Sequence, residues 1–160
     1  MTPDNVRSCE YFQEQGKKKG KEAYEAVIGS RKFDNIMKNR LLSILKTRIQ
    51  LLGGKVGKVL ELMAGQGRNF PVLRAYFSEV EMLEQAKSLT DCFDKRIKKH
   101  VMRIQDFTWP IDEYECVIGV WCLAYLGNQD IENVLEKAIK AVRKGGHILL
   151  FEPILPVDGN

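Results

Sequence analysis

The sequence predicts an α/β fold: a doubly wound, mainly parallel sheet of about five strands, preceded by a helical segment. From residue 55 onward, short apolar runs alternate with stretches of helical period. Each run is nearly continuous in apolar residues, which is typical of strands buried on both faces of a parallel sheet. Right-handed crossovers between such strands place helices on both faces. The 160 residues suit one domain, 1–160, with a helical segment at 1–54 and an α/β core at 55–160.

The strongest helical period lies before the sheet. Apolar residues recur there at i, i+3 and i+4 and form one stripe, which Gly53-Gly54 would end. The stripe consists of Phe33, Ile36, Met37, Leu41, Ile44, Leu45, Ile49 and Leu52. Upstream, residues 5–28 predict one or two short helices, broken near Gly16 and Gly20.

Within the core, the period switches repeatedly between strand and helix. Strands are expected at 56–62, 79–83, 101–104, 114–120 and 147–151. Helices are expected at 69–76, 86–98 and 130–142, and Gly145-Gly146 would end the last of them.

The composition narrows the class of protein. With 44% hydrophobic and 29% charged residues, the chain is ordinary for a soluble globular protein. No apolar run approaches the roughly 20 residues of a membrane span, and residues 1–5 lack the features of a secretory signal. A net charge of +4 is too small to predict nucleic-acid binding. The basic runs 17–21 and 95–99 are more typical of solvated helix faces than of binding patches, although they could attract an acidic partner.

The four cysteines do not predict a metal site, because no two of them are spaced as C-x-x-C. Cys116 and Cys122 lie in or beside an apolar strand and are expected to be small core residues. A reducing compartment fits best, so an intracellular location in the cytoplasm or nucleus is expected.

A glycine turn and a carboxylate follow the first two strands. Gly65 and Gly67 would let the backbone pass under a ligand, and the helix start behind them offers free N–H groups. Glu84 follows about 20 residues later, a distance at which a carboxylate can accept both hydroxyl hydrogens of a ribose. The alternative interpretation is a structural turn beside a solvated loop acid.

The other strand ends add weaker signals. Gln105 or Asp106 could bond the exocyclic amine of a purine, or Asp106 could cap a turn. Trp121 and Tyr125 either wall a ligand or close the core. Arg68 either pairs with a ligand carboxylate or lies on the surface of a helix start. A glycine turn, an acid for ribose and an arginine for a carboxylate favour S-adenosylmethionine over a dinucleotide.

Residues 58–150 resemble class I S-adenosylmethionine-dependent methyltransferases, which have a Rossmann-like fold. Within them the chain looks most like the protein N-terminal α-amino methyltransferases, which methylate exposed Xaa-Pro-Lys termini. The matching motifs are LELMAGQGR (60–68), FSEVEMLE (77–84), QDFT (105–108), YECVIGVW (114–121), LGNQ (126–129) and RKGGHILL (143–150).

This resemblance implies roles for particular residues. Gly65 and Arg68 would contact the methionine part of the cofactor and Glu84 its ribose. Ile104 and Gln105 would contact the adenine edge. Trp121 would line the peptide channel, with Tyr125 nearby in the position of a family histidine.

The chain departs from the family where catalysis is concerned. Met63 replaces the first motif glycine, Val120 a glutamine, Tyr125 the histidine, and Pro153 an asparagine that helps to orient and deprotonate the substrate amine. Methyl transfer to an amine needs a proton acceptor near the attacking nitrogen. Glu152 and Asp158 are the nearby candidates, so the catalytic residues are left unassigned.

A complete sheet of this class adds an antiparallel hairpin after the fifth strand, and the chain stops at Asn160 before one. Residues 148–151 would then form an open apolar edge, which we expect a second copy, another subunit or a separate piece of the same gene product to cover. Two functions remain in view. One is an S-adenosylmethionine-dependent methyltransferase acting on a protein or peptide amine. The other is a catalytically inactive, methyltransferase-like structural or regulatory subunit of a larger assembly.

Overall fold

The computed structural model describes residues 31–48, 56–91 and 93–152, and it contains a five-stranded parallel sheet in the order β3-β2-β1-β4-β5. The strands are β1 (Val56–Leu62), β2 (Phe77–Glu84), β3 (Lys98–Val101), β4 (Tyr114–Val120) and β5 (Val142–Phe151). The order reverses between β1 and β4, and ligands of such folds bind beyond the carboxyl ends of the strands at this point. The predicted fold class is confirmed.

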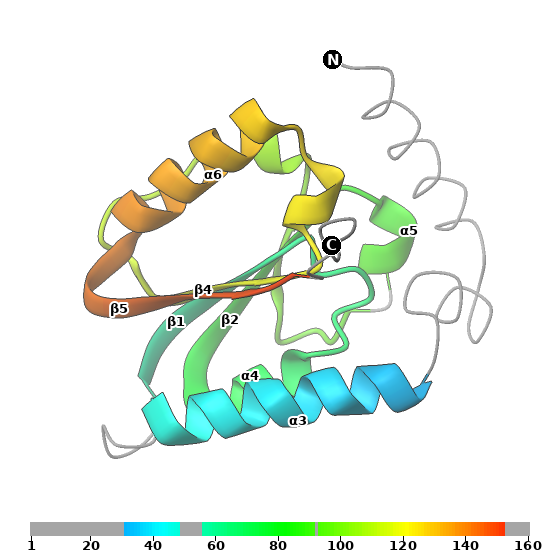
Figure 1. The fold of residues 1–160 in the computed structure, drawn as a ribbon. Helices are drawn as coiled ribbons and strands as arrows, with labels where there is room; N and C mark the ends of the chain where they lie inside the picture. Colours follow the sequence, from blue (N-terminus) through cyan, green and yellow to red (C-terminus); the bar gives the residue numbers. More distant parts are fainter. Residues whose placement is uncertain (1–30, 49–55, 92, 153–160) are drawn as a thin grey trace, which may run out of the picture.

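Helices cover both faces of the sheet (Figure 1). Helices α3 (Arg31–Arg48) and α4 (Phe70–Tyr76) lie against one face, and α6 (Asn128–Ala141) lies against the other. Helix α5 (Lys87–Thr90) is a single turn. Of the predicted stripe, Leu41 and Leu45 are buried in α3. Ile49, Leu52, Gly53-Gly54 and the helices expected within 5–28 lie outside the described residues.

Each face of the sheet has its own apolar core. The cluster on the α3 and α4 side includes Leu41, Leu45, Val59, Phe70, Leu73, Val80, Met82, Cys116 and Ile118. The cluster on the α6 side includes Leu60, Leu62, Leu83, Ile104, Tyr114, Val117, Cys122, Val134 and Ala138. Cys116 and Cys122 are both fully buried, which confirms them as core residues, and burial raises the pKa of each thiol.

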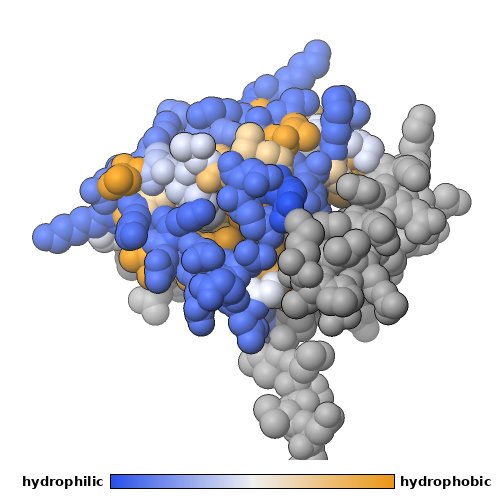
Figure 2. Space-filling view, turned by 90° about the horizontal axis from the view of Figure 1, so that it is seen from above, coloured by the Kyte–Doolittle hydropathy of each residue, from blue (hydrophilic) through white to orange (hydrophobic). Residues whose placement is uncertain are grey.

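Polar residues dominate the α6 side of the molecule where the described residues are visible, with small hydrophobic areas between them (Figure 2). Isolated exposed apolar side chains such as Ile139 are ordinary on a protein surface. No helix among the described residues is long and apolar enough to cross a membrane.

The helix predicted at 86–98 is wrong beyond Thr90. Asp94 accepts hydrogen bonds from the backbone N–H and the guanidinium of Arg96, both at 2.9 Å. This local side-chain bond stabilises a turn in competition with the helix. The next strand is therefore β3, at Lys98–Val101 rather than 101–104, and Ile104–Asp106 forms the short 3₁₀ helix η2.

Gly145-Gly146 does not end a helix, as the sequence suggested, but forms a bulge inside β5. Helix α6 ends at Ala141 and β5 begins at the next residue. Tyr114 pairs with Val142 but Cys116 pairs with His147, so β5 carries extra residues at this point. Gly145 has φ +83°, and a Cβ on Gly146 would lie 2.7 Å from the Glu115 carbonyl oxygen. Glycine is needed at both positions.

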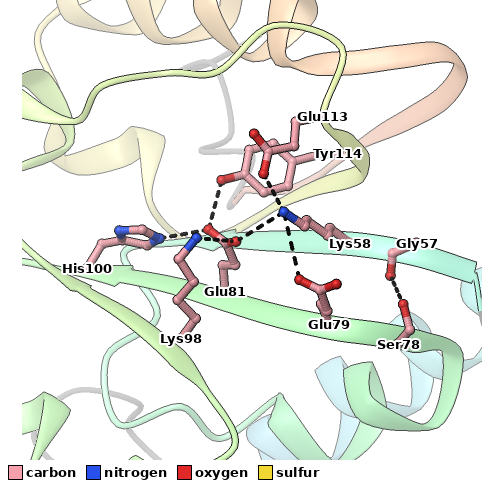
Figure 3. A network of polar contacts seen from close by, with 9 residues as sticks. All are labelled: Gly57, Lys58, Ser78, Glu79, Glu81, Lys98, His100, Glu113 and Tyr114. Carbon is pink, nitrogen blue, oxygen red and sulfur yellow. Dashed lines mark hydrogen bonds and ion pairs between the residues drawn. The ribbon is translucent and has the colours of Figure 1, made fainter.

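A buried carboxylate in β2 explains why charged residues are found in β3 (Figure 3). Glu81 is 1% exposed and accepts hydrogen bonds from Lys98 Nζ (2.8 Å) and Tyr114 Oη (3.0 Å). His100 Nε2 lies 2.7 Å from it, and Lys58 Nζ lies 4.0 Å away. Burial alone would raise the pKa of Glu81, but the hydrogen bonds outweigh burial and lower this pKa to about 2.

Candidate functional site

The turn after β1 has an unusual backbone. Met63, Gly65 and Gly67 all have left-handed φ angles, of +48°, +58° and +71°. Ala64 N–H donates to the Leu83 carbonyl at 3.0 Å, which ties the turn to the end of β2. A Cβ on Gly67 would lie 3.0 Å from the Phe93 ring, so this turn packs closely against the α3 and α4 side. Glycine suits positions 65 and 67 because few other residues adopt left-handed φ angles without strain.

Glu84 lies directly against this turn, and its contact with a ribose remains a prediction. Its Oε2 accepts a hydrogen bond from Gly65 N–H at 2.9 Å, and its Oε1 accepts one from Ala86 N–H at 2.9 Å. The residue is 6% exposed. Burial raises its pKa, although the backbone hydrogen bonds work in the opposite direction. Each carboxylate oxygen can accept a second hydrogen bond, so the pair of oxygens can still take two hydroxyl hydrogens.

Glu61 is a candidate site residue that the sequence analysis missed. It lies in β1, is 2% exposed, and accepts a hydrogen bond from Asn69 Nδ2 at 2.6 Å. Its buried Oε2 has no hydrogen-bond partner among the described residues. Burial raises the pKa of Glu61 to about 7, against the opposing effects of Asn69 and of the Arg68 charge. A buried carboxylate oxygen beside the glycine turn suits an ammonium group or a water held by a ligand.

Arg68 follows the turn and is partly buried, and its charge acts on Glu61. The structure therefore places a cation and an anion together at the start of α4. An amino-acid group of a ligand carries both a carboxylate and an ammonium, and this pair is complementary to it. The predicted contact of Arg68 with a ligand carboxylate remains a prediction.

Met63 stands at the position where the resemblance expects glycine. Its side chain is half-buried and packs against the α6-side cluster, as do Trp109, Leu123 and Leu126. The backbone at Met63 is thus held in a left-handed conformation within the glycine turn, and the apolar contact holds the side chain.

Replacing Met63 tests whether its bulk or its strain limits ligand binding. Met63→Gly removes both and is expected to tighten binding of S-adenosylhomocysteine about tenfold, measured by calorimetric titration. Met63→Ala is the matched control, because it removes the bulk and keeps the left-handed strain. An equal gain in affinity in both variants would show that the size of the Met63 side chain limits binding. Unchanged affinity in both would show that Met63 does not restrict the site.

The two residues expected at the adenine edge, Ile104 and Gln105, make different contacts. Ile104 is 4% exposed and belongs to the α6-side cluster. Gln105 Nε2 donates to Asp130 Oδ2 in the first turn of α6 at 3.1 Å. The amide nitrogen of Gln105 is thus engaged, and its carbonyl oxygen is the atom that could accept a hydrogen bond from a purine amine.

The candidate substrate residues follow β4. Trp121 and Tyr125 are both half-buried, and Leu123–Tyr125 forms the 3₁₀ helix η3. Trp121 has φ +55°, and its N–H donates to the Phe151 carbonyl at 2.9 Å. Their contact with a substrate remains a prediction.

Glu152 does not lie free as a proton acceptor. Its carboxylate accepts hydrogen bonds from the backbone N–H groups of Cys122 (3.0 Å), Leu123 (3.1 Å) and Ala124 (3.4 Å). Asp158 and Pro153 lie outside the described residues. The described residues hold no group of three metal-ligating side chains.

The fold and the glycine turn with its facing carboxylate are those of a class I methyltransferase. Residues 19–158 match the family described as AdoMet dependent proline di-methyltransferase, so the chain belongs to this family. AdoMet is S-adenosylmethionine, the cofactor that the Glu84 and Gly65 arrangement favours. A search of curated proteins gave no match.

Solved structures share the fold at low sequence identity. The chain is similar to phosphoethanolamine N-methyltransferase 1 of Haemonchus contortus, solved with phosphoethanolamine and S-adenosylhomocysteine (15% identity, TM-score 0.77, covering 98% of this chain and 37% of that one). It is also similar to a SAM-dependent methyltransferase of Leishmania major (16% identity, TM-score 0.71, covering 92% and 60%). A third similar structure is the DhpI-SAM-HEP complex (16% identity, TM-score 0.72, covering 98% and 70%). The chain thus spans less than two thirds of each of the first two proteins, 37% and 60% of their lengths.

Proposed function

We propose that this protein is an S-adenosylmethionine-dependent methyltransferase that acts on the N-terminal α-amine of a protein or peptide. The observation that carries the proposal is the contact between Glu84 and Gly65, at 2.9 Å, in a chain of an AdoMet-dependent family. Glu84 would accept the ribose hydroxyls. Glu61 and Arg68 would face the amino-acid group, and Ile104 and Gln105 the adenine.

The family description supports an amine acceptor. A proline nitrogen inside a peptide is an amide without a usable lone pair, so two methyl groups can be added only to the free nitrogen of a first-position proline. In each transfer, the nitrogen lone pair forms a bond to the methyl carbon and the carbon–sulfur bond breaks, leaving S-adenosylhomocysteine. The resulting ammonium must lose a proton before a second transfer. Trp121 and Tyr125 would flank the peptide.

Transfer of a labelled methyl group tests this proposal. With labelled S-adenosylmethionine, we expect incorporation into an Xaa-Pro-Lys peptide whose first residue is proline, and none into the same peptide with an acetylated N-terminus. Phosphoethanolamine, the ligand of the Haemonchus enzyme, serves as the small-amine comparison. Transfer to phosphoethanolamine alone would move the acceptor to small molecules. Binding of the cofactor without transfer to either would overturn the proposed activity.

The second candidate function is a cofactor-binding but catalytically inactive subunit. It is favoured by Met63 in the glycine turn and by the three N–H donors that occupy Glu152. Cofactor binding without methyl transfer is its expected signature, whereas methyl transfer rejects it.

We propose that a second copy of the chain pairs with the outer edge of β5. The two edges of the sheet differ: β3 is rich in charged residues, while residues 148–151 of β5 are uncharged and apolar. Lysines on an edge strand discourage pairing, and an apolar edge favours it. A two-fold axis would bring one β5 against the other, so the same surface would serve both copies.

Light scattering after size exclusion tests this pairing. Wild-type protein is expected to be a dimer at micromolar concentration, and Leu150→Lys is expected to be a monomer. Leu42→Lys in α3 is the matched control, because Leu42 and Leu150 are both 39% exposed. A wild-type monomer, or equal effects of the two substitutions, would contradict a β5 interface.

A further inference from the structure

Three successive backbone N–H groups form an anion-binding nest around the Glu152 carboxylate. They belong to successive residues, Cys122, Leu123 and Ala124, and converge on one carboxylate that comes from the end of β5. Successive N–H groups after a left-handed residue form a concave nest for an anion. Here the anion is supplied by the protein itself, across a separation of about 30 residues in the chain.

Trp121, the residue before this nest, is strained. A bulky side chain at φ +55° is an outlier among L-residues, and such a conformation persists only where the surroundings fix it. The surroundings here are the last residues of β5. Phe151 accepts the Trp121 N–H at 2.9 Å, and Glu152 holds the next three N–H groups. Both sides of the strained residue are therefore tied to the same strand.

The strain lies at the switch point of the sheet. Leu62 of β1 pairs with Gly119 of β4, so the segments that follow these strands begin beside each other. Met63 and Trp121 follow the two strands, and both have left-handed φ angles. Strained backbone at two neighbouring strand ends marks the place where the site is shaped.

We infer that Glu152 is a positioning residue for Trp121: by filling the nest at 122–124 it holds the indole beside the acceptor position, rather than acting as the base. The inference rests on the proposed function for the identity of the acceptor. Three of the four lone-pair positions of this carboxylate accept backbone N–H groups, which favours a positioning role for Glu152 over the role of a base.

Hydrogen exchange and tryptophan quenching test the contact without cofactor or acceptor. Trp109 and Trp121 are the two tryptophans of the chain, so Trp109→Phe leaves Trp121 as the single reporter. In that background, Glu152→Gln and Glu152→Ala are expected to speed amide exchange at 122–124 by about tenfold or more, with alanine the larger effect. Acrylamide quenching of Trp121 should rise in the same order. Glu136→Gln on the exposed side of α6 is the matched control.

Two results would overturn the inference. One is wild-type exchange and quenching at 121–124 in both variants. The other is an equal acceleration of the amides of β1, which would make Glu152 a contributor to overall stability alone. Should Glu152→Ala fail to fold, Glu152→Gln, which keeps the volume and one acceptor oxygen, decides the question.

Kinetics then separate this inference from the proposed function. In an active enzyme, Glu152→Gln should raise KM for the acceptor peptide about tenfold while the affinity for S-adenosylhomocysteine changes less than about twofold. Loss of cofactor affinity instead would reject a role on the acceptor side. A wild-type protein that transfers no methyl group would reject the proposed function, and the exchange measurements would still decide whether Glu152 holds Trp121.

Discussion

Glu84→Gln is expected to weaken binding of S-adenosylhomocysteine about a hundredfold in a calorimetric titration, because hydrogen bonds to a charged acceptor contribute about 1.5–3 kcal/mol each. The carboxylate already accepts Gly65 N–H and Ala86 N–H, one on each oxygen. Glutamine keeps one acceptor oxygen and turns an NH₂ group toward one of these donors. The ribose would lose one acceptor, and the turn would lose the partner of one N–H.

Measuring the affinity of Glu84→Gln for adenosine distinguishes loss of the ribose contact from a general loosening of the glycine turn. If Glu84 holds the sugar, adenosine alone should lose about as much affinity as S-adenosylhomocysteine does. Glu79→Gln is the matched control, since Glu79 lies on the same strand with 61% of its side chain exposed. Unchanged affinity for both ligands in Glu84→Gln would remove the main support for cofactor binding at this turn.

The sequence predicts the fold best where local pattern and tertiary environment agree. Residues 56–62 and 114–120 are mostly apolar, and the structure has strands with the same bounds. The helix predicted at 86–98 ends early because Asp94 and Arg96 form a local turn, and the strand that follows is stabilised by a distant partner. Lys98 belongs to a basic run that is typical of a solvated helix face, yet it pairs with Glu81 on the neighbouring strand, as does His100. Nothing within the segment itself indicates that partner.

The same distinction holds in the candidate site. The pairing of Glu84 with Gly65 follows from strand spacing, because parallel neighbours end at one edge of the sheet. Glu61 could have been found as the one charge within the otherwise apolar stretch 59–64, at the start of the glycine turn. Glu152 could not have been placed from sequence, because its partners are backbone N–H groups in a loop whose shape depends on Trp121 and on β5.

Glu81→Gln is expected to lower the free energy of unfolding by about 3 kcal/mol at pH 7, since removing one charge from a buried ion-pair network leaves its partners uncompensated. Glu81 gathers Lys98, His100 and Tyr114 around one carboxylate. Glutamine can accept hydrogen bonds from some of them, but its NH₂ group faces the others. Glu79→Gln removes an exposed ion pair on the same strand and should cost under about 0.5 kcal/mol.

The effect of Glu81 should depend on pH, and its sign follows from the pKa. The folded-state pKa of Glu81 is about 2, below the value of 4.5 for a free glutamate, so the unfolded chain takes up the proton first. The stabilisation is complete above about pH 5 and is lost as the pH falls toward 2. Urea unfolding at pH 7, 5 and 3 should therefore show the gap between wild type and Glu81→Gln narrowing toward acid. A gap that is constant, or that widens, would mean that Glu81 acts through packing rather than through its charge.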